Sequence, residues 1–486
     1  MDGRVLRGGA LATVAVLAAV LLPLSASAAT QPGDAEIEAR WQALGGASGG
    51  LGPELPPPND VPRAVTGGRV QDFTAGSVFW SSATGAWEVT GDILTYYRVP
   101  ANGAALGFPA AAPEDVAGAG TEQAFTGGAV FSSAATGAHR VAGAVLTRYQ
   151  AAGGPAGPLG FPTADEGAAG PTGSRVGVFE GGSVYWSSTT GARLVSEPVL
   201  QRYLALGGPS GLLGLPTGEE AAVVGGTRQT FQKAHVFHSA STGVRYVKGA
   251  ILKKFSSIGG TGSYLGMPTS DETRITGGWR SHFVNGNITY LSGKGAQVNG
   301  AWRPAVQRVT AAELPYTYRS GCPVGPSSLR RVKMPYYDWS GVPRIGDLIV
   351  RASAADDMVR VFRRAHTAKF PIRQMRPVDV WQGNDVRAME ADNTSAFNCR
   401  KVTGNPYRLS QHSYGNAIDI NTRENPYVTA SRVYPSGSRT YLNRRNVRKG
   451  MIVSSGPIAR GMRAEGWPWG ARWSRPDYQH FSSNGR

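Results

Sequence analysis

Cysteine and histidine are scarce in this sequence, and their scarcity limits the chemistry that the chain can carry. Two of the 486 residues are cysteine and seven are histidine. No CxxC pair is present, which argues against zinc ligation by thiolates. An SxxK string with its partner motifs is also absent, so nothing supports a serine nucleophile of the penicillin-binding type.

Long hydrophobic runs are missing after the first thirty residues, so we expect no membrane span in the rest of the chain. Arg4 and Arg7 precede an apolar run over 10–24, which is shorter than the roughly twenty residues of a spanning helix. An A-x-A cleavage string follows at 26–28. This arrangement predicts a secretory signal peptide over 1–28 and a secreted mature protein that is soluble or held to the cell wall non-covalently.

Negative charge is scarce in the C-terminal part of the chain. Residues 304–486 contain 29 Lys and Arg against 13 Asp and Glu, whereas residues 29–303 contain 19 of each kind. A basic excess of this size would suggest nucleic acid for a cytoplasmic protein. For an exported protein the available polyanions are wall polymers and acidic peptides, so we expect those partners and no nucleic acid.

A repeated string occupies the first two thirds of the chain. LGFP occurs at 106–109 and 159–162, LGLP at 213–216 and LGMP at 265–268, and a degenerate copy lies at 51–53. Each copy is followed by an aromatic strand pattern that ends in a turn, such as SVFWSSATGA from Ser77. Such alternation predicts a β-hairpin arm. A period of this length predicts one supersecondary unit per repeat.

These copies resemble the LGFP repeats of actinobacterial cell-wall proteins. The resemblance implies a mainly β domain of five repeats over 37–303 that associates with cell-wall polysaccharide. Five copies could close into a disc, which would protect every sheet edge. Aromatic residues such as Trp80 and Trp186 favour contact with carbohydrate, while a domain that serves only as a spacer is the alternative.

The residues with the clearest chemistry lie near the C-terminus. His412 and Asp419 occur in the string SQHSYGNAID, and His480 closes the string WSRPDYQHF. Two imidazoles and one carboxylate form a ligand set that holds zinc and leaves a fourth position open. Asp477 supplies a second carboxylate that could accept a proton from the attacking water. The small Gly415 would let the backbone pass close to the metal.

The strings SxHxxGxAxD and GWPWGARWSRPDYQHF resemble the M15 family of zinc D,D-peptidases. The resemblance implies an α+β peptidase domain of the hedgehog/D,D-peptidase type with one zinc ion. Its ligands would be His412, Asp419 and His480, and Asp477 would be the catalytic acid and base.

The reaction that this resemblance implies is hydrolysis of the stem peptide of peptidoglycan, as by a D-alanyl-D-alanine carboxypeptidase. Many carboxypeptidase members carry Glu at the place of Asp477, and Asp is typical of the endopeptidase-like branch. Cleavage of an L-alanyl-D-glutamate bond is therefore the alternative. A non-catalytic wall-binding protein is a third possibility, which the complete set of site residues argues against.

Members of this family also use an arginine that binds the substrate carbonyl or carboxylate, usually within an SGYR string that is absent here. Arg400 and Arg376 are the candidates, and Arg400 is preferred. A planar guanidinium suits this role because it pairs with a carboxylate and stabilises an oxyanion. Ser410 is expected to orient His412 or the substrate, and Trp469 to bind substrate as part of the cleft wall.

The two cysteines, Cys322 and Cys399, both lie in the C-terminal third of the chain. An even number of cysteines in an exported protein predicts a disulfide. We place a Pro-containing linker at 304–316 and the peptidase domain at 317–486. Within that domain, a capping box at Ser353 and apolar residues at helical spacing predict a helix that ends near Lys369.

Overall fold

The computed structural model of the protein describes residues 31–116, 118–403 and 405–485. The predicted signal peptide over 1–28 lies outside the described residues. The chain divides into two compact units, of which one ends at Gly143 and the other begins at Ala144. Among the helices described, none combines the length and the apolar character that a membrane crossing requires.

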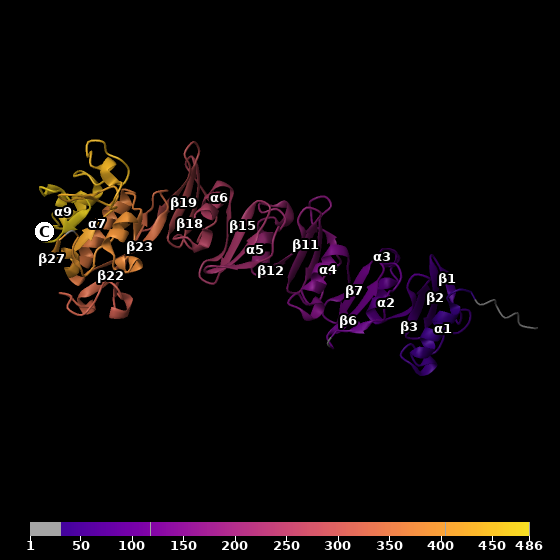
Figure 1. The fold of residues 1–486 in the computed structure, drawn as a ribbon. Coiled ribbons are helices and arrows are strands. Elements are labelled where there is room, and N and C mark those ends of the chain that lie inside the picture. Colours follow the sequence, from indigo (N-terminus) through magenta and orange to yellow (C-terminus); the bar gives the residue numbers. More distant parts are fainter. Residues whose placement is uncertain (1–30, 117, 404, 486) are drawn as a thin grey trace, which may run out of the picture. The chain divides into compact units, whose positions relative to one another are not determined.

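Each repeat forms an antiparallel sheet of four strands in sequence order (Figure 1). The strands are β1 Arg63–Val65, β2 Gly68–Phe73, β3 Gly76–Ser81, β4 Gly85–Thr90, β5 Glu114–Asp115, β6 Gly120–Phe125, β7 Gly128–Ser133, β8 Gly137–Val141, β9 Gly167–Ala168, β10 Arg175–Phe179, β11 Gly182–Ser187, β12 Gly191–Ser196, β13 Ala221–Val223, β14 Gly226–Thr230, β15 Ala234–Ser239, β16 Gly243–Lys248, β17 Thr273–Ile275, β18 Gly278–Phe283, β19 Gly286–Leu291 and β20 Gly295–Gly300. The helices of this region are α1 Asp34–Ala43, α2 Gly91–Tyr97, α3 Pro100–Leu106, α4 Gly143–Ala151, α5 Val199–Ala205 and α6 Gly249–Ser257.

The predicted hairpin arms are present, and a local hydrogen-bond pattern explains their turns. The Ser81 hydroxyl accepts the Thr84 N–H at 3.2 Å and contacts the Thr84 hydroxyl at 2.8 Å. Gly85 then adopts a φ of 76°, a left-handed conformation that glycine tolerates without strain. Ser133 and Thr136 make the same pair of contacts in the next repeat.

The expected closure of the repeats into a disc is not confirmed, because the sheets are open. Each sheet contains four strands, and none of the strand pairs in the described residues joins the sheet of one repeat to that of another. Within the second unit, side chains of different repeats instead form ion pairs. Arg148 pairs with Glu219 at 3.0 Å, and Arg202 pairs with Asp271.

The C-terminal domain has an α+β composition, as predicted. Its strands are β21 Ala305–Arg308, β22 Leu329–Tyr337, β23 Pro343–Arg351, β24 Gln374–Met375, β25 Asn393–Thr394, β26 Lys401–Val402, β27 Asn405–Leu409, β28 Ala417–Asp419, β29 Tyr427–Val428, β30 Val433–Tyr434 and β31 His480–Ser482. Its helices are α7 Ala355–Thr367, α8 Asp385–Glu390 and α9 Pro457–Ala464.

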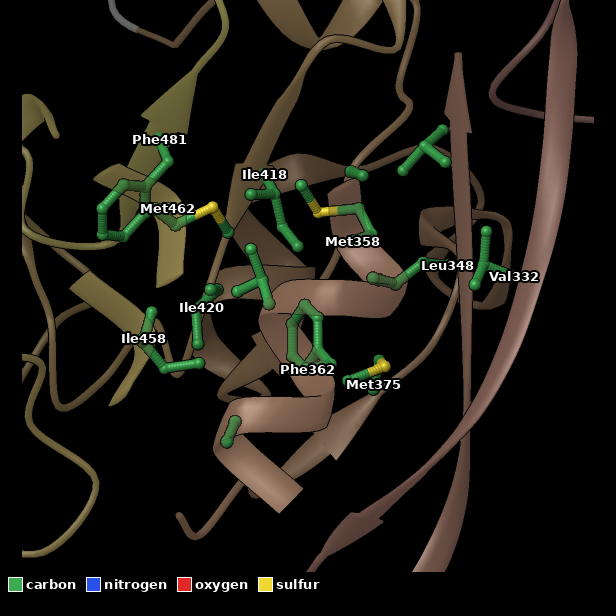
Figure 2. Close-up of a cluster of buried hydrophobic side chains, with 14 of the residues drawn as sticks. Val332, Leu348, Met358, Phe362, Met375, Ile418, Ile420, Ile458, Met462 and Phe481 are labelled. Carbon is green, nitrogen blue, oxygen red and sulfur yellow. The ribbon is translucent and has the colours of Figure 1, made fainter. Parts of the chain in front are cut away.

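One hydrophobic core connects helices α7 and α9 with strands β22, β23, β24, β28 and β31 (Figure 2). Met358 and Phe362 of α7 meet Leu348 of β23, and Ile418 of β28 and Phe481 of β31 belong to the same cluster. The helix occurs where its apolar spacing predicted it. The predicted capping box is wrong, however, because the N-cap residue is Ala354, which has no side chain that could accept a hydrogen bond.

The stretch 304–316, predicted as a linker, is part of the C-terminal domain. Ala305–Arg308 form β21, which pairs antiparallel with β22. Leu314 is fully buried in a second cluster, and Trp302 packs against the core of the domain. The extended proline-containing sequence had the composition of a linker, but its backbone hydrogen bonds are used to extend the sheet.

Cys322 and Cys399 form the predicted disulfide. Cys399 also donates its backbone N–H to the Thr317 carbonyl at 3.0 Å, so two bonds join the beginning of the domain to this segment. The next residue, Arg400, accepts the Ser410 N–H at 3.0 Å through its carbonyl. The disulfide therefore supports the chain directly behind the residues that carry the predicted metal site.

Candidate metal centre and cleft

Pairing of β28 with β31 brings two of the predicted ligands together across 61 residues of sequence. In this antiparallel pair Asp419 lies opposite His480, and Ile418 lies opposite Phe481. Because successive side chains of a strand point to opposite faces, Ile418 and Phe481 enter the core while Asp419 and His480 face the other side. The core thus fixes the register of the two ligands.

His412 reaches the same place from a short 3-10 turn over Gln411–Tyr414. The Ser410 hydroxyl accepts the His412 N–H at 3.3 Å and caps this turn, which fits the orienting role predicted for Ser410. The His412 Nδ1 bonds to the Ala396 carbonyl, which can only accept a hydrogen bond. Nδ1 therefore donates its proton to this carbonyl, and Nε2 is the ring atom that faces His480 and Asp419.

The three side chains converge on one point with a donor set that suits a metal cation. His412 Nε2 lies 3.2 Å from Asp419 Oδ2, His480 Nδ1 lies 3.0 Å from Asp419 Oδ1, and the two ring nitrogens lie 3.2 Å apart. One ligand atom from each residue falls within 4.8 Å of the others. Two imidazole nitrogens and a carboxylate oxygen at these separations are a donor set that suits a divalent cation.

Burial and charge at this centre act in opposite directions on Asp419. The side chain is 4 % exposed, and burial alone would raise the pKa of its carboxyl group. The imidazoles of His412 and His480 lower the pKa by charge and hydrogen bonding, and the result is a pKa well below the usual range. The carboxyl group of Asp419 therefore stays ionised at physiological pH.

Asp477 lies beside the centre, is 7 % exposed, and has a carboxylate oxygen, Oδ1, without a hydrogen-bond partner among the described residues. Burial raises the pKa of Asp477 to about 8, and the negative charge of Asp419 adds to the shift. Its backbone N–H donates to the Gly470 carbonyl at 3.1 Å. A Cβ at position 470 would lie 2.8 Å from the Asp477 carbonyl oxygen, so this close approach requires glycine.

A cavity of about 540 Å³, which we call the cleft, opens over the centre. It is lined by His412, Asp419 and His480 together with Asp477 and Ser410. Ligand sites in proteins commonly have volumes in this range and a few convergent polar groups. The wall of the cleft also includes the aromatic residues Tyr427, Tyr434 and Trp473.

Arg400, the preferred arginine of the sequence analysis, lines the cleft. Its Nη2 lies 2.8 Å from Asp385 Oδ2, and its Nη1 donates to the Lys401 carbonyl at 3.0 Å. Asp385 also accepts the Thr403 hydroxyl at 2.7 Å. No sequence pattern pointed to Asp385, because it lies 15 residues from Arg400 and in no motif with it.

Three predicted positions lie elsewhere. Arg376 is exposed at the end of β24 and does not line the cleft. Trp469 stacks on Phe481 and lines a separate cavity of about 400 Å³, so the structure does not support its predicted place in the cleft wall. Gly415 approaches the backbone of Arg351 and not the metal centre, since a Cβ there would lie 2.8 Å from the Arg351 nitrogen.

Comparison with protein families finds repeats over most of the chain and a peptidase segment near its C-terminus. Residues 403–483 match the family described as D-alanyl-D-alanine carboxypeptidase, a group of M15 peptidases. Five segments match the LGFP repeat, namely 56–100, 106–157, 159–211, 213–263 and 265–303. No curated protein matches the chain.

The protein therefore consists of an LGFP repeat array followed by a peptidase domain. Within that domain, residues 403–483 match the M15 peptidases, the family that the sequence motifs predicted. The matched segment contains His412, Asp419, Asp477 and His480, whereas Arg400 precedes it.

Proposed function

We propose that the protein is a zinc-dependent peptidase that hydrolyses the peptide stems of peptidoglycan, in the manner of a D-alanyl-D-alanine carboxypeptidase. The observation that carries the proposal is the convergence of His412, Asp419 and His480 within 4.8 Å beside the buried carboxyl group of Asp477. A family match alone would not require all four side chains to meet in one cleft. A relic domain without activity would have no need to retain them together.

Zinc held by the two histidines and Asp419 would polarise the scissile carbonyl and lower the pKa of a nearby water. Asp477 would accept a proton from the water that attacks the carbonyl carbon, and then deliver it to the nitrogen of the leaving amine. A dication close by favours the ionised form of a carboxyl group, which offsets the raised pKa of Asp477. Asp477 would then be ionised at neutral pH, as a general base must be.

Arg400 is the proposed partner for the negative charge that develops on the substrate carbonyl oxygen. The Asp385 carboxylate and the Lys401 carbonyl hold its guanidinium in place. A donor fixed before the reaction does not have to reorganise when charge develops, which is the main advantage of such a group over water. Arg376 has no such position, so we assign no role in catalysis to it.

The bond cleaved has two candidates. A carboxypeptidase would remove a terminal D-alanine, and an endopeptidase would cut the L-alanyl-D-glutamate bond inside the stem. The aspartate at position 477, typical of the endopeptidase-like branch, favours the second candidate, while the matching family description favours the first.

The site of action that fits these features is the cell wall outside the membrane. The five LGFP repeats would hold the enzyme on wall polysaccharide, since repeats of this kind occur in cell-wall-associated proteins. The signal peptide predicted over 1–28 would export the chain. Peptidoglycan is then both the support and the substrate.

Digestion of purified cell wall, followed by mass spectrometry of the stem peptides, tests the function and the bond together. Loss of one terminal alanine would identify a carboxypeptidase, and new N-terminal D-glutamate would identify the endopeptidase. The Asp477→Asn variant serves as the inactive control. Unchanged stems after treatment with zinc-loaded wild-type protein would disprove the proposed function.

A further inference from the structure

Three arginines besides Arg400 line the cleft, and each comes from a different segment of the domain. Arg408 lies on β27, Arg432 lies in the turn between β29 and β30, and Arg475 lies two residues before Asp477. All three are exposed. We call them the rim arginines.

The carboxylates of the cleft do not neutralise the rim arginines. Asp385 is bound to Arg400, Asp419 to the two histidines, and Asp477 is buried. In the part of the chain that the structure describes, no ion pair or side-chain hydrogen bond involves the guanidinium of a rim arginine. Three positive charges therefore face the cleft without a counter-charge from the protein.

Some other arginines of the same domain have carboxylate partners. Arg360 and Arg364 share Glu465 at 2.8 and 3.2 Å, and Arg331 contacts Glu313 at 2.6 Å. The rim arginines have no such partner among the described residues and line the cavity that a substrate would enter, and a concave site concentrates the field of their charges.

We propose that the rim arginines select an acidic peptide, a stem that carries more than one free carboxylate beside the scissile amide. This inference rests on the proposed peptidase function. An arginine forms two parallel hydrogen bonds with a carboxylate, and this charge-assisted pair is stronger than one with a neutral amide. Carboxylates fit better than phosphate polymers because the same cleft contains the groups that act on a peptide bond. Amidation of the stem carboxylates would remove these pairs.

The test uses the full-length zinc-loaded protein and two soluble peptides of one sequence, with the internal carboxylates free or amidated. We expect kcat/KM to be at least about tenfold higher for the free acid, the effect of roughly one charged hydrogen-bond pair. Arg408→Gln, Arg432→Gln and Arg475→Gln should each lower kcat/KM for the free acid more than for the amide, chiefly through KM.

Arg363→Gln is the matched control, because Arg363 is an exposed arginine of α7 that does not line the cleft. It removes the same charge and should leave the preference unchanged. Equal rates for the two wild-type substrates would overturn the inference and leave the peptidase function intact. An equal loss of preference in Arg363→Gln and the rim variants would also overturn it, since net charge and not the cleft would then decide. If the zinc-loaded protein cleaved neither peptide, the result would instead contradict the proposed peptidase function on which the inference rests.

Discussion

Asp477 and His480 are three residues apart in sequence, yet the structure gives them different relations to the metal centre. His480 Nδ1 lies among the converging ligand atoms, whereas Asp477 keeps a free oxygen beside them. We expect Asp477→Asn to retain about one zinc per chain and to lose roughly a hundredfold or more in turnover, the scale of a general base. His480→Ala should lose the metal as well as the activity.

Metal analysis of the two purified variants, together with kcat on a soluble stem peptide, checks this prediction. Asp385→Asn is a useful comparison, since it removes a carboxylate of the cleft that contacts Arg400 and no metal ligand. Loss of zinc from Asp477→Asn would show that Asp477 is a metal ligand. The proton transfer would then have no assigned residue.

His366 is a buried histidine of the core and has no role in the cleft. Burial lowers the pKa of His366 to about 4, and the charge of Lys369 adds to the effect. In the unfolded chain the pKa of histidine is about 6.5, so the unfolded state binds the proton more readily. The contribution of neutral His366 to the free energy of unfolding is therefore fully present above pH 6.5 and is lost as the pH falls toward 4.

His366→Phe should remove this pH dependence, because phenylalanine cannot titrate and keeps a ring beside Trp302 and Tyr337. Between pH 7.5 and 4.5 we expect the free energy of unfolding of the wild type to fall by about 1–3 kcal/mol more than that of the variant. Urea unfolding at the two pH values measures the difference. Parallel losses in both proteins would show that other groups carry the acid sensitivity.

At the scale of elements, the disulfide supports the metal centre through the chain behind it. Cys399 precedes Arg400, whose N–H donates to the Ser413 hydroxyl at 3.0 Å, and the Asn398 N–H donates to the His412 carbonyl at 3.2 Å. The disulfide closes a sequence separation of 77 residues. The double change Cys322→Ser and Cys399→Ser should lower the free energy of unfolding by about 2–5 kcal/mol.

Denaturant unfolding and zinc affinity, each measured with and without reductant, check the effect of the disulfide. The wild type under reducing conditions should behave like the double variant, and the double variant should not respond to reductant. A wild type that keeps its stability and zinc affinity after full reduction would show that the hydrogen bonds alone hold this segment.

At the scale of the whole molecule, the C-terminal domain uses residues from Trp302 onward, since Trp302 packs against its core and β21 joins its sheet. A chain that begins at Ala301 keeps Trp302 on the core and β21 on the sheet. We expect it to fold and to cleave soluble stem peptides at nearly the full-length rate. A chain that begins at Leu314 lacks both and should unfold at lower denaturant concentration, as followed by tryptophan fluorescence.

The same shortened chain from Ala301 tests the role of the repeats on the wall. Its sedimentation with insoluble cell wall should fall relative to full length, and the remainder should weaken with salt because the basic surface binds through charge. Equal sedimentation of both chains at high salt would show that the repeats do not bind the wall and serve only as a spacer.

The sequence by itself determined the repeats, the candidate metal ligands and the disulfide. Each has a strong local signal: a recurring LGxP string, histidines and an aspartate within two compact motifs, and a single pair of cysteines. The helix of Met358 and Phe362 was also predictable, since apolar spacing depends on the face that the helix buries. Its cap was not, because the chain uses a preceding 3-10 turn in place of the expected serine.

Only the tertiary structure decided which other residues reach the cleft. Arg400 and Arg376 were both sequence candidates, with Arg400 preferred, and the fold places Arg400 in the cleft wall and Arg376 outside it. Trp469 points away from the cleft because its stacking on Phe481 uses the core side of β31. Arg408 and Arg432 come from separate hairpins with no shared motif, so their meeting depends on packing between segments far apart in sequence. Short sequence motifs identify candidate ligands, and apolar periodicity identifies the buried face of a helix. The residues that line the cleft are brought together by contacts between distant segments, which no short motif contains.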